Sequence, residues 1–156
     1  MPLCYIGLGS NLGQREDYLR RAIAAMRQRG LEIAAQGPVR QTAPLENTQQ
    51  PDFLNQVVCV NTSLDPRGLL ELLLDVESAL GRVRDVPKGP RTIDCDILLY
   101  GNLVLDSPEL VLPHPAITTR PFVTEQLVEL DAEIRDPRNG QLLREVCNGF
   151  ETAQCG

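Results

Sequence analysis

Three short apolar segments with the composition of buried strands constrain the fold of this chain most. Residues 3–8, 53–63 and 92–100 are rich in β-branched and aliphatic side chains and are bounded by turn residues. They lie far apart in the sequence and differ from helix patterns by their shortness. We therefore predict that they pair with one another in one central sheet.

Two helix patterns separate these strands. The first predicted helix covers residues 14–29, with its apolar side chains on one face. The second begins at Asp65, a good N-cap, and at Pro66 in the first helical position, runs to Leu80 and stops at Gly81. Each helix follows a strand directly, so both are expected to pack on the sheet.

The remaining segments complete an order of β-α-β-β-α-β-β-α. They are a weaker strand at 31–41 broken by Gly37-Pro38, a Gly101-Asn102 hairpin leading into 103–105, a helix over about 119–130, a small Asn139-Gly140 hairpin and a frayed tail over 147–156. This order predicts an α+β fold: a ferredoxin-like α/β sandwich with a mainly antiparallel central sheet and helices packed on it. The length, 156 residues, predicts one domain over 1–156.

Composition excludes several classes of function. A formal charge of −6 argues against a general nucleic-acid binder, and a single histidine excludes a multi-histidine metal site. No apolar run approaches the ~20 residues of a membrane span. The five cysteines lack metal-ligand spacing, so we expect reduced thiols in a cytoplasmic protein, and a monomer because no large apolar patch is marked.

The strongest chemical feature is Asp94-Cys95-Asp96 within the strand at 92–100. Side chains alternate along a strand, so the two carboxylates are expected on one face, with Ile93, Cys95, Ile97 and Leu99 on the other. Carboxylate oxygens that would otherwise repel each other favour Mg²⁺, especially when substrate phosphates complete its shell. The alternative is an exposed strand face with two solvated acids.

A basic segment directly precedes this strand. Arg82, Arg84, Lys88 and Arg91 are offset only by Asp85, which gives +3 locally in an acidic protein. Arginine binds phosphate through two parallel hydrogen bonds, and lysine adds a point charge. A solvated charge run is the usual alternative, but the neighbouring acidic pair favours a polyphosphate–Mg²⁺ substrate.

Weaker candidates lie elsewhere in the chain. Leu70, Leu74 and Glu77 form a second stripe on the helix from Pro66, which either lines a slot for a flat base or is simply buried. The other candidates are an aromatic and an amide on one strand face (Phe53, Asn55), a lone histidine between prolines (His114), and a basic and an aromatic residue near a helix start (Arg120, Phe122).

Taken together, these segments resemble one family, the 6-hydroxymethyl-7,8-dihydropterin pyrophosphokinases of folate biosynthesis. The similar segments are YIGLGSNLG (5–13), QTAPL (41–45), QPDFLN (50–55), GRVR (81–84), GPRTIDCDILLYG (89–101), LPHP (112–115) and Arg120-Pro121-Phe122. The GPR-x-x-D-x-D segment that follows a G-R-x-R element is the most specific of them.

The resemblance implies transfer of the pyrophosphoryl group of ATP to the pterin hydroxymethyl oxygen, which yields AMP and the pterin diphosphate. It implies two Mg²⁺ ions held by Asp94 and Asp96, and phosphate contacts from Arg82 and Arg91. It also implies that ATP is bound by Leu70, Leu74, Glu77, Arg84, Lys88, Ile97, His114 and Arg120. Around the pterin it implies Thr42, Ala43, Leu45, Phe53, Asn55 and Phe122.

Two other functions remain as alternatives. A nucleotidyltransferase of the Gly-Ser…Asp-x-Asp type needs its Gly-Ser turn shortly before the acidic pair, whereas Gly9-Ser10 lies more than eighty residues upstream. A non-catalytic ferredoxin-like ligand-binding module has no reason to place an acidic pair beside four cations.

Overall fold

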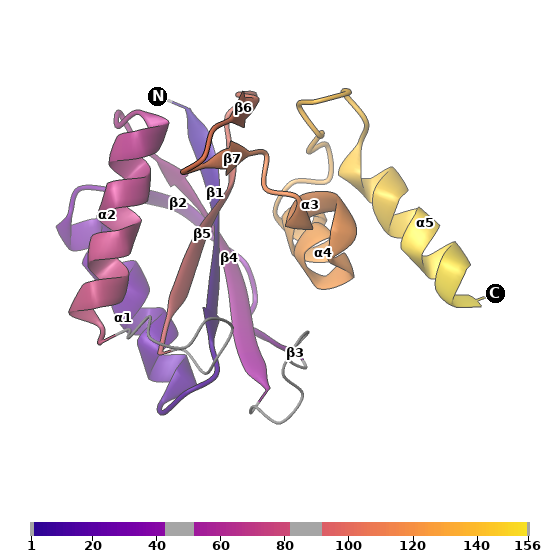
Figure 1. Cartoon of the computed structure of the whole chain (residues 1–156). Helices are drawn as coiled ribbons and strands as arrows, with labels where there is room; N and C mark the ends of the chain where they lie inside the picture. The colour runs from indigo at the N-terminus through magenta and orange to yellow at the C-terminus, as the bar shows by residue number, and fades with distance from the viewer. Residues whose placement is uncertain (1, 43–51, 82–91, 156) are drawn as a thin grey trace.

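A five-stranded antiparallel sheet forms the centre of the molecule in the computed structural model, which describes residues 2–42, 52–81 and 92–155 (Figure 1). The strands are β1 (Leu3–Ser10), β2 (Glu32–Gln36), β3 (Arg40–Thr42), β4 (Phe53–Asn61), β5 (Asp94–Tyr100), β6 (Leu105–Asp106) and β7 (Val111–Leu112). The helices are α1 (Arg15–Gln28), α2 (Pro66–Ala79), α3 (Ala116–Thr119), α4 (Pro121–Leu130) and α5 (Leu143–Cys155). The predicted α+β sandwich with an antiparallel sheet is confirmed.

The order of the sheet is β2-β4-β1-β5, with β3 also paired to β4. The break predicted at Gly37-Pro38 separates β2 from β3, and both pair with successive parts of β4. Gly37 stays attached to β4 at this break, because its N–H donates to the Val57 carbonyl at 2.8 Å. Because β5 is last in the strand order, it is an edge strand that pairs only with β1.

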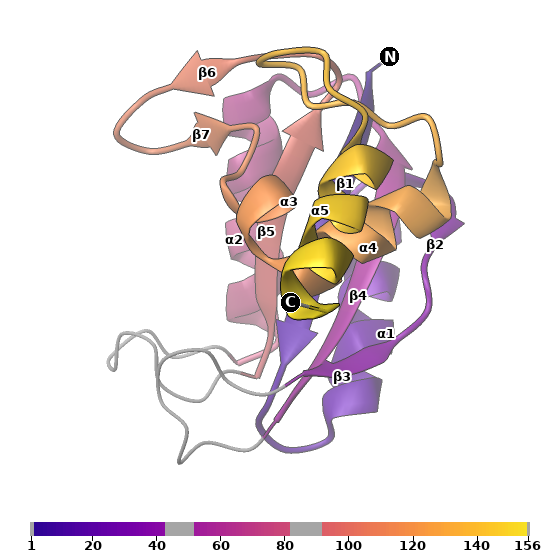
Figure 2. The same ribbon diagram turned by 90° about the vertical axis from the view of Figure 1, so that its right-hand side faces the viewer.

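Two helical layers cover the two faces of the sheet (Figures 1 and 2). On one face, α1 and α2 pack against a core that includes Ile6, Leu73 and Ile97. On the other, α3, α4 and α5 pack against a second core that includes Val57 and Leu127. The start of α2 is as predicted, since the Asp65 carboxylate accepts a hydrogen bond from the Gly68 N–H at 2.7 Å.

A β-bulge in β5 corrects one predicted side-chain direction. Tyr5 pairs with Leu99 and Ile6 with Ile97, so Leu98 is an extra residue on the β5 side. Leu99 consequently faces the second core with Leu98, instead of sharing the face of Cys95 and Ile97. Strict alternation failed here because one inserted residue shifts the register by one.

The hairpin predicted from β5 through Gly101-Asn102 is wrong. A turn does form, with the Leu103 N–H donating to the Tyr100 carbonyl, but β6 pairs with β7 in a separate two-stranded sheet. The outer edge of β5 is bonded elsewhere: the Cys95 N–H donates to Glu77, and the Leu98 carbonyl accepts from the His114 N–H. These bonds leave that edge unavailable to a hairpin partner.

In the C-terminal third, one predicted helix is confirmed and one predicted segment needs correction. The helix expected over about 119–130 is present as α4, which begins with Pro121 in its first position, and the short helix α3 precedes it. The tail expected to be frayed over 147–156 is helical as far as Cys155. Leu143 and Val146 attach this helix to the second core. The small hairpin at Asn139-Gly140 is present as an antiparallel bridge between Arg135 and Leu142.

None of the described helices is both long and apolar enough to span a membrane. Among the described side chains, Cys4, Cys59, Cys95 and Cys147 form no disulfide.

Candidate active site

The floor of the candidate site is Gly9 of β1, which has no side chain. Gly9 pairs with Asn55 of β4 on one side and with Asp94 of β5 on the other, so these three residues form one rung of the sheet. Directly paired residues project to the same face. Asn55 and Asp94 therefore stand on either side of a glycine, with a gap between them that any other residue would fill.

The two aspartates of β5 project to this face as predicted. Asp94 is half-buried and Asp96 is exposed, whereas Cys95 between them is buried among the core residues of the opposite face. The side chain of Leu98, two residues further along, lies over Gly7, where an added Cβ would meet Leu98 Cδ1 at 3.3 Å. The carboxylates thus emerge beside glycine backbone and are bounded at one end by Leu98.

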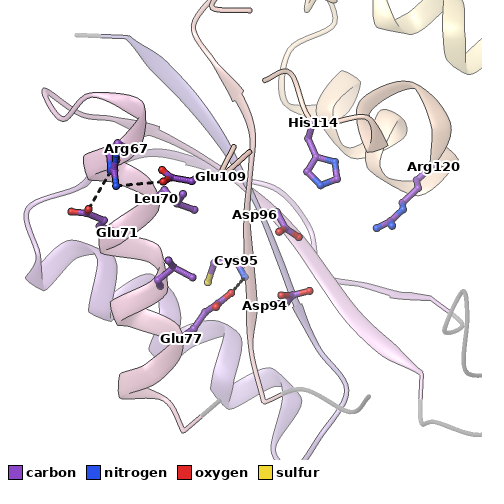
Figure 3. Close-up of a pocket in the computed structure, with 11 residues that line it drawn as sticks. Arg67, Leu70, Glu71, Glu77, Asp94, Cys95, Asp96, Glu109, His114 and Arg120 are labelled. Carbon is purple, nitrogen blue, oxygen red and sulfur yellow. Dashed lines mark hydrogen bonds and ion pairs between the residues drawn. The ribbon is translucent and has the colours of Figure 1, made fainter. Parts of the chain in front are cut away.

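A pocket of about 670 Å³ opens at the β5 edge, between α2 and the segment that carries α3 and α4 (Figure 3). The resemblance predicted seven of its lining residues as site residues: Leu70, Leu74, Glu77, Asp94, Asp96, His114 and Arg120. These residues come from four separate segments, and only the edge position of β5 allows side chains from both helical layers to meet there.

His114 faces Asp96 from the opposite wall of the pocket (Figure 3). Burial, and then the positive charge of Arg120, lowers the pKa of His114 below its ordinary value of 6.5, while Asp94 acts in the other direction. The Nδ1 atom accepts a hydrogen bond from the Ala116 N–H at 3.0 Å. A neutral imidazole with Nδ1 engaged in this way carries its proton on Nε2, which makes that atom a hydrogen-bond donor.

Arg120 stands at the N-terminus of α4 and lines the same pocket. The amide dipoles at a helix N-terminus favour an anion, and the guanidinium adds a full positive charge. The wall formed by His114 and Arg120 is therefore suited to phosphate, opposite a carboxylate pair suited to a cation.

The predicted pterin-side residues of β4 lie next to Gly9. An added Cβ on Gly9 would meet Asn55 Oδ1 at 3.2 Å and Phe53 Cδ1 at 3.5 Å. The Asn55 side-chain amide donates a hydrogen bond to the Thr42 hydroxyl of β3, which fixes its orientation. Phe53, Asn55 and Thr42 therefore form one cluster, and Asn55 shares its rung of the sheet with Asp94.

Some predicted site residues do not line the pocket. Ile97 is 3% exposed and belongs to the first core, so it does not line the pocket. Phe122 packs at the edge of the second core and does not line the pocket either. The remaining predicted residues lie outside the described part of the chain: Ala43, Leu45, Arg82, Arg84, Lys88 and Arg91.

Arg67, Glu71 and Glu109 also line the pocket and were not predicted. Arg67 forms ion pairs with Glu71 at 3.6 Å and with Glu109 at 3.5 Å, all three side chains being largely exposed (Figure 3). The i, i+4 spacing of Arg67 and Glu71 signals only a helix surface pair. Glu109 belongs to the β6–β7 connection. No local sequence pattern indicates that this connection lies over α2.

The donor set at Asp94 and Asp96 fits Mg²⁺. The described residues contain no group of three or more histidine, cysteine or acidic side chains that could hold a metal by themselves. Mg²⁺ is commonly held by one or two carboxylates, with water and substrate phosphates supplying the other ligands. Two carboxylates facing a phosphate-binding wall match that mode.

The structure also explains why a Gly-Ser nucleotidyltransferase site is absent. Although Gly9 lies beside Asp94, Ser10 follows it on β1 and projects to the opposite face, where it is fully buried. Its hydroxyl therefore cannot reach a ligand held by the carboxylates.

Comparison with known proteins shows the family of the chain. The profile of the family described as 7,8-dihydro-6-hydroxymethylpterin-pyrophosphokinase (HPPK) matches residues 5–132. A 2-amino-4-hydroxy-6-hydroxymethyldihydropteridine pyrophosphokinase of Bacillus subtilis is 41% identical over 133 residues, covering 85% of this chain and 80% of the relative. The protein of the same description in Pseudomonas aeruginosa is 39% identical over 143 residues, covering 91% and 88%.

Solved structures show the same fold. The crystal structure of Plasmodium falciparum HPPK-DHPS with pterin and p-hydroxybenzoate superposes with a TM-score of 0.76 at 14% identity, over 97% of this chain. This chain spans 43% of that protein, so the likeness concerns one part of a longer enzyme.

The fold and the site define a ferredoxin-like α/β sandwich with an acidic pair at its edge strand and a wall of His114 and Arg120 opposite. Within that class, the chain belongs to the 7,8-dihydro-6-hydroxymethylpterin-pyrophosphokinase (HPPK) family.

Proposed function

We propose that this chain transfers the pyrophosphoryl group of ATP to the hydroxymethyl group of 6-hydroxymethyl-7,8-dihydropterin, a step of folate biosynthesis. It is an ATP-dependent pyrophosphokinase, as its relatives are named. The observation that supports the residue assignment is the rung Asn55–Gly9–Asp94, since the cluster of Phe53, Asn55 and Thr42 lies beside the acidic pair.

In the reaction the hydroxymethyl oxygen attacks the β-phosphorus of ATP, and the bond between the β-phosphorus and the α,β-bridging oxygen breaks. AMP leaves with that oxygen, the hydroxyl proton is released, and the β- and γ-phosphates remain on the pterin. In such transfers the protein mainly positions the reactants and neutralises charge.

Each group of residues contributes one of these effects. Phe53 offers a ring face for stacking, and Asn55 and Thr42 offer hydrogen bonds at the edge of the pterin. Leu70 and Leu74 line the nucleoside side of the pocket. Arg120 offsets the negative charge of phosphate oxygens, and the Nε2–H of His114 donates a hydrogen bond to them. Asp94 and Asp96 would hold Mg²⁺, which when bound offsets the negative charge of the phosphates.

Several finer points belong to the proposal. They are the binding of two Mg²⁺ ions, the phosphate contacts of Arg82, Arg84, Lys88 and Arg91, and the pterin contacts of Ala43, Leu45 and Phe122. A monomer and a cytoplasmic location complete it. The acidic pair supports the metal, and the local charge of the basic segment supports the phosphate contacts.

Product analysis tests this function directly. The protein is incubated with ATP, Mg²⁺ and 6-hydroxymethyl-7,8-dihydropterin, and the nucleotide and pterin products are separated and quantified. We expect AMP and pterin diphosphate in equal amounts and no AMP without pterin. Formation of ADP, or no product, contradicts the proposal.

A further inference from the structure

Glu77 near the end of α2 is a buried carboxylate in the wall of the pocket. It is only 2% exposed, and among the described residues Asp136 is the one other charged side chain buried to this degree. Asp136 is paired with Arg138 in the loop before α5. Burying a carboxylate beside two other carboxylates costs free energy. We therefore expect Glu77 to have a specific role at this position.

The Glu77 carboxylate binds the backbone of the acidic strand. Its Oε2 atom accepts a hydrogen bond from the Cys95 N–H at 2.8 Å, and Figure 3 shows this bond reaching the strand from the α2 side. The amide concerned belongs to the peptide group that joins Asp94 to Cys95. Glu77 therefore holds the main chain between the two residues that carry the carboxylates, Asp94 and Asp96.

This bond acts on an edge strand of the sheet. β5 is an edge strand, so only β1 pairs with it along its length. An edge strand held on one side alone can twist away from its neighbour, and a carboxylate moves with its backbone. The bond from Glu77 restrains the Asp94–Cys95 peptide group from the side of β5 that faces away from β1.

Resting on the proposed function, we propose that Glu77 is a positioning residue that keeps the Asp94 and Asp96 carboxylates at the spacing that a metal–nucleotide complex requires. It does so through the Cys95 amide, and it is not itself a ligand of the nucleoside. The absence of any metal-binding group of three among the described residues agrees with a role outside the ligand set.

The first test measures the bond itself in protein free of metal and nucleotide. Amide hydrogen exchange of Cys95 is followed by NMR in the wild type, Glu77→Ala, Glu77→Gln and the control Asp75→Asn. Asp75 is an exposed carboxylate on the same helix, ion-paired with Arg29. We expect exchange at least tenfold faster in Glu77→Ala, and wild-type exchange in Glu77→Gln and Asp75→Asn, because glutamine keeps an acceptor oxygen.

The second test separates metal binding from nucleoside binding. Mn²⁺ affinity is measured by EPR with a non-hydrolysable ATP analogue, and AMP affinity is measured by calorimetry without metal. We expect Glu77→Ala to weaken Mn²⁺ binding about tenfold and to leave AMP binding within twofold, with Glu77→Gln restoring Mn²⁺ binding.

Three results would overturn the proposal. They are weaker AMP binding with unchanged Mn²⁺ binding, unchanged Cys95 exchange in Glu77→Ala, or lost Mn²⁺ affinity in a Glu77→Gln variant that still protects Cys95. If Glu77→Ala does not fold, Glu77→Asp replaces it, since its shorter side chain keeps the charge but cannot reach Cys95. The exchange test needs no turnover, so a failure of the proposed activity in product analysis stays distinguishable from a failure of this role.

Discussion

At the scale of single residues, the acidic pair combines high chemical importance with low structural importance. Asp94 is half-buried and Asp96 is exposed, and the core on the opposite face is built by their neighbours Ile93, Cys95 and Ile97. Side chains that lie outside a core contribute little to the free energy of unfolding.

We therefore predict that Asp94→Asn and Asp96→Asn each lower kcat by about 10²-fold or more, because removing a charge that stabilises the transferring phosphates costs this much. The free energy of unfolding should change by less than about 0.5 kcal/mol. Steady-state AMP formation and urea denaturation measure the two quantities. A variant that keeps a third of the wild-type kcat contradicts the metal-binding role.

The second residue-scale prediction concerns the buried carboxylate of Asp136. Arg138 donates to it at 2.6 and 3.2 Å from its side chain to Oδ2 and at 2.9 Å from its backbone N–H to Oδ1. These side-chain bonds hold the pKa of Asp136 below its ordinary value of 3.8. The folded state therefore binds fewer protons than the unfolded state, and the resulting stability is present above pH 3.8 and lost as the pH falls below it.

Arg138→Met should accordingly lower the free energy of unfolding by about 1–2 kcal/mol at pH 7, a partly exposed hydrogen-bonded charge pair being lost. At pH 3 the difference from the wild type should be smaller. Urea denaturation at the two pH values measures both. An equal difference at pH 7 and pH 3 would mean that Asp136 does not titrate through this pair.

At the scale of elements, β1 shapes the site by what it lacks. Gly9 leaves a gap between Asn55 and Asp94, and an added Cβ would come within 3.2 Å of Asn55 Oδ1. Such a contact is tighter than ordinary van der Waals distance, so the Asn55 amide must turn or shift.

Gly9→Ala should therefore weaken pterin binding by about tenfold, or about 1.4 kcal/mol, and should leave ATP binding within twofold. Calorimetric titration with each ligand separates the two effects. The matched control is Gly149→Ala in α5, where an added Cβ meets nothing within 4 Å. Equal loss of both affinities in Gly9→Ala would indicate a general distortion of β1.

The elements also show how far sequence alone could go. The cap at Asp65 and Pro66, the break at Gly37-Pro38 and the shared face of Asp94 and Asp96 follow from local rules, and all are confirmed. The bulge at Leu98 and the pairing of β6 with β7 were missed, because each depends on partners distant in the sequence.

The site shows the same division. The resemblance predicted most of the pocket wall, including His114 and Arg120, but it also included Ile97, which the core holds. That Gly9 lies between Asn55 and Asp94 depends on the register of three strands, which no local spacing reveals. Arg67 and Glu109 meet only because the β6–β7 connection lies over α2.

At the scale of the whole molecule, the two cores have different tasks. The first core lies between the sheet and α1 and α2, and the second joins the sheet to α3, α4 and α5. The pocket wall of His114 and Arg120 stands on the second layer, so its place relative to β5 depends on the second core. α5 closes this core from outside through Leu143, which is fully buried.

We predict that Leu143→Ala lowers the free energy of unfolding by about 2–5 kcal/mol, because it removes a buried leucine and leaves a cavity. At temperatures below the unfolding transition of the variant, kcat should stay within threefold of the wild-type value, since Leu143 does not line the pocket. Thermal and urea denaturation measure the first quantity and AMP formation the second. The exposed Glu145→Gln on the same helix serves as control, and a loss below about 1 kcal/mol in Leu143→Ala would show that α5 is dispensable for stability.

The glycine floor also bears on how inhibitors of this enzyme could lose their effect. A compound resting on Gly9 contacts main-chain atoms, which no missense change can delete. Every replacement of this glycine adds atoms, and those atoms point at Asn55 and Phe53, which the proposed substrate needs. Drug resistance arising at this position would therefore carry a direct penalty in folate synthesis, which makes the floor a durable target.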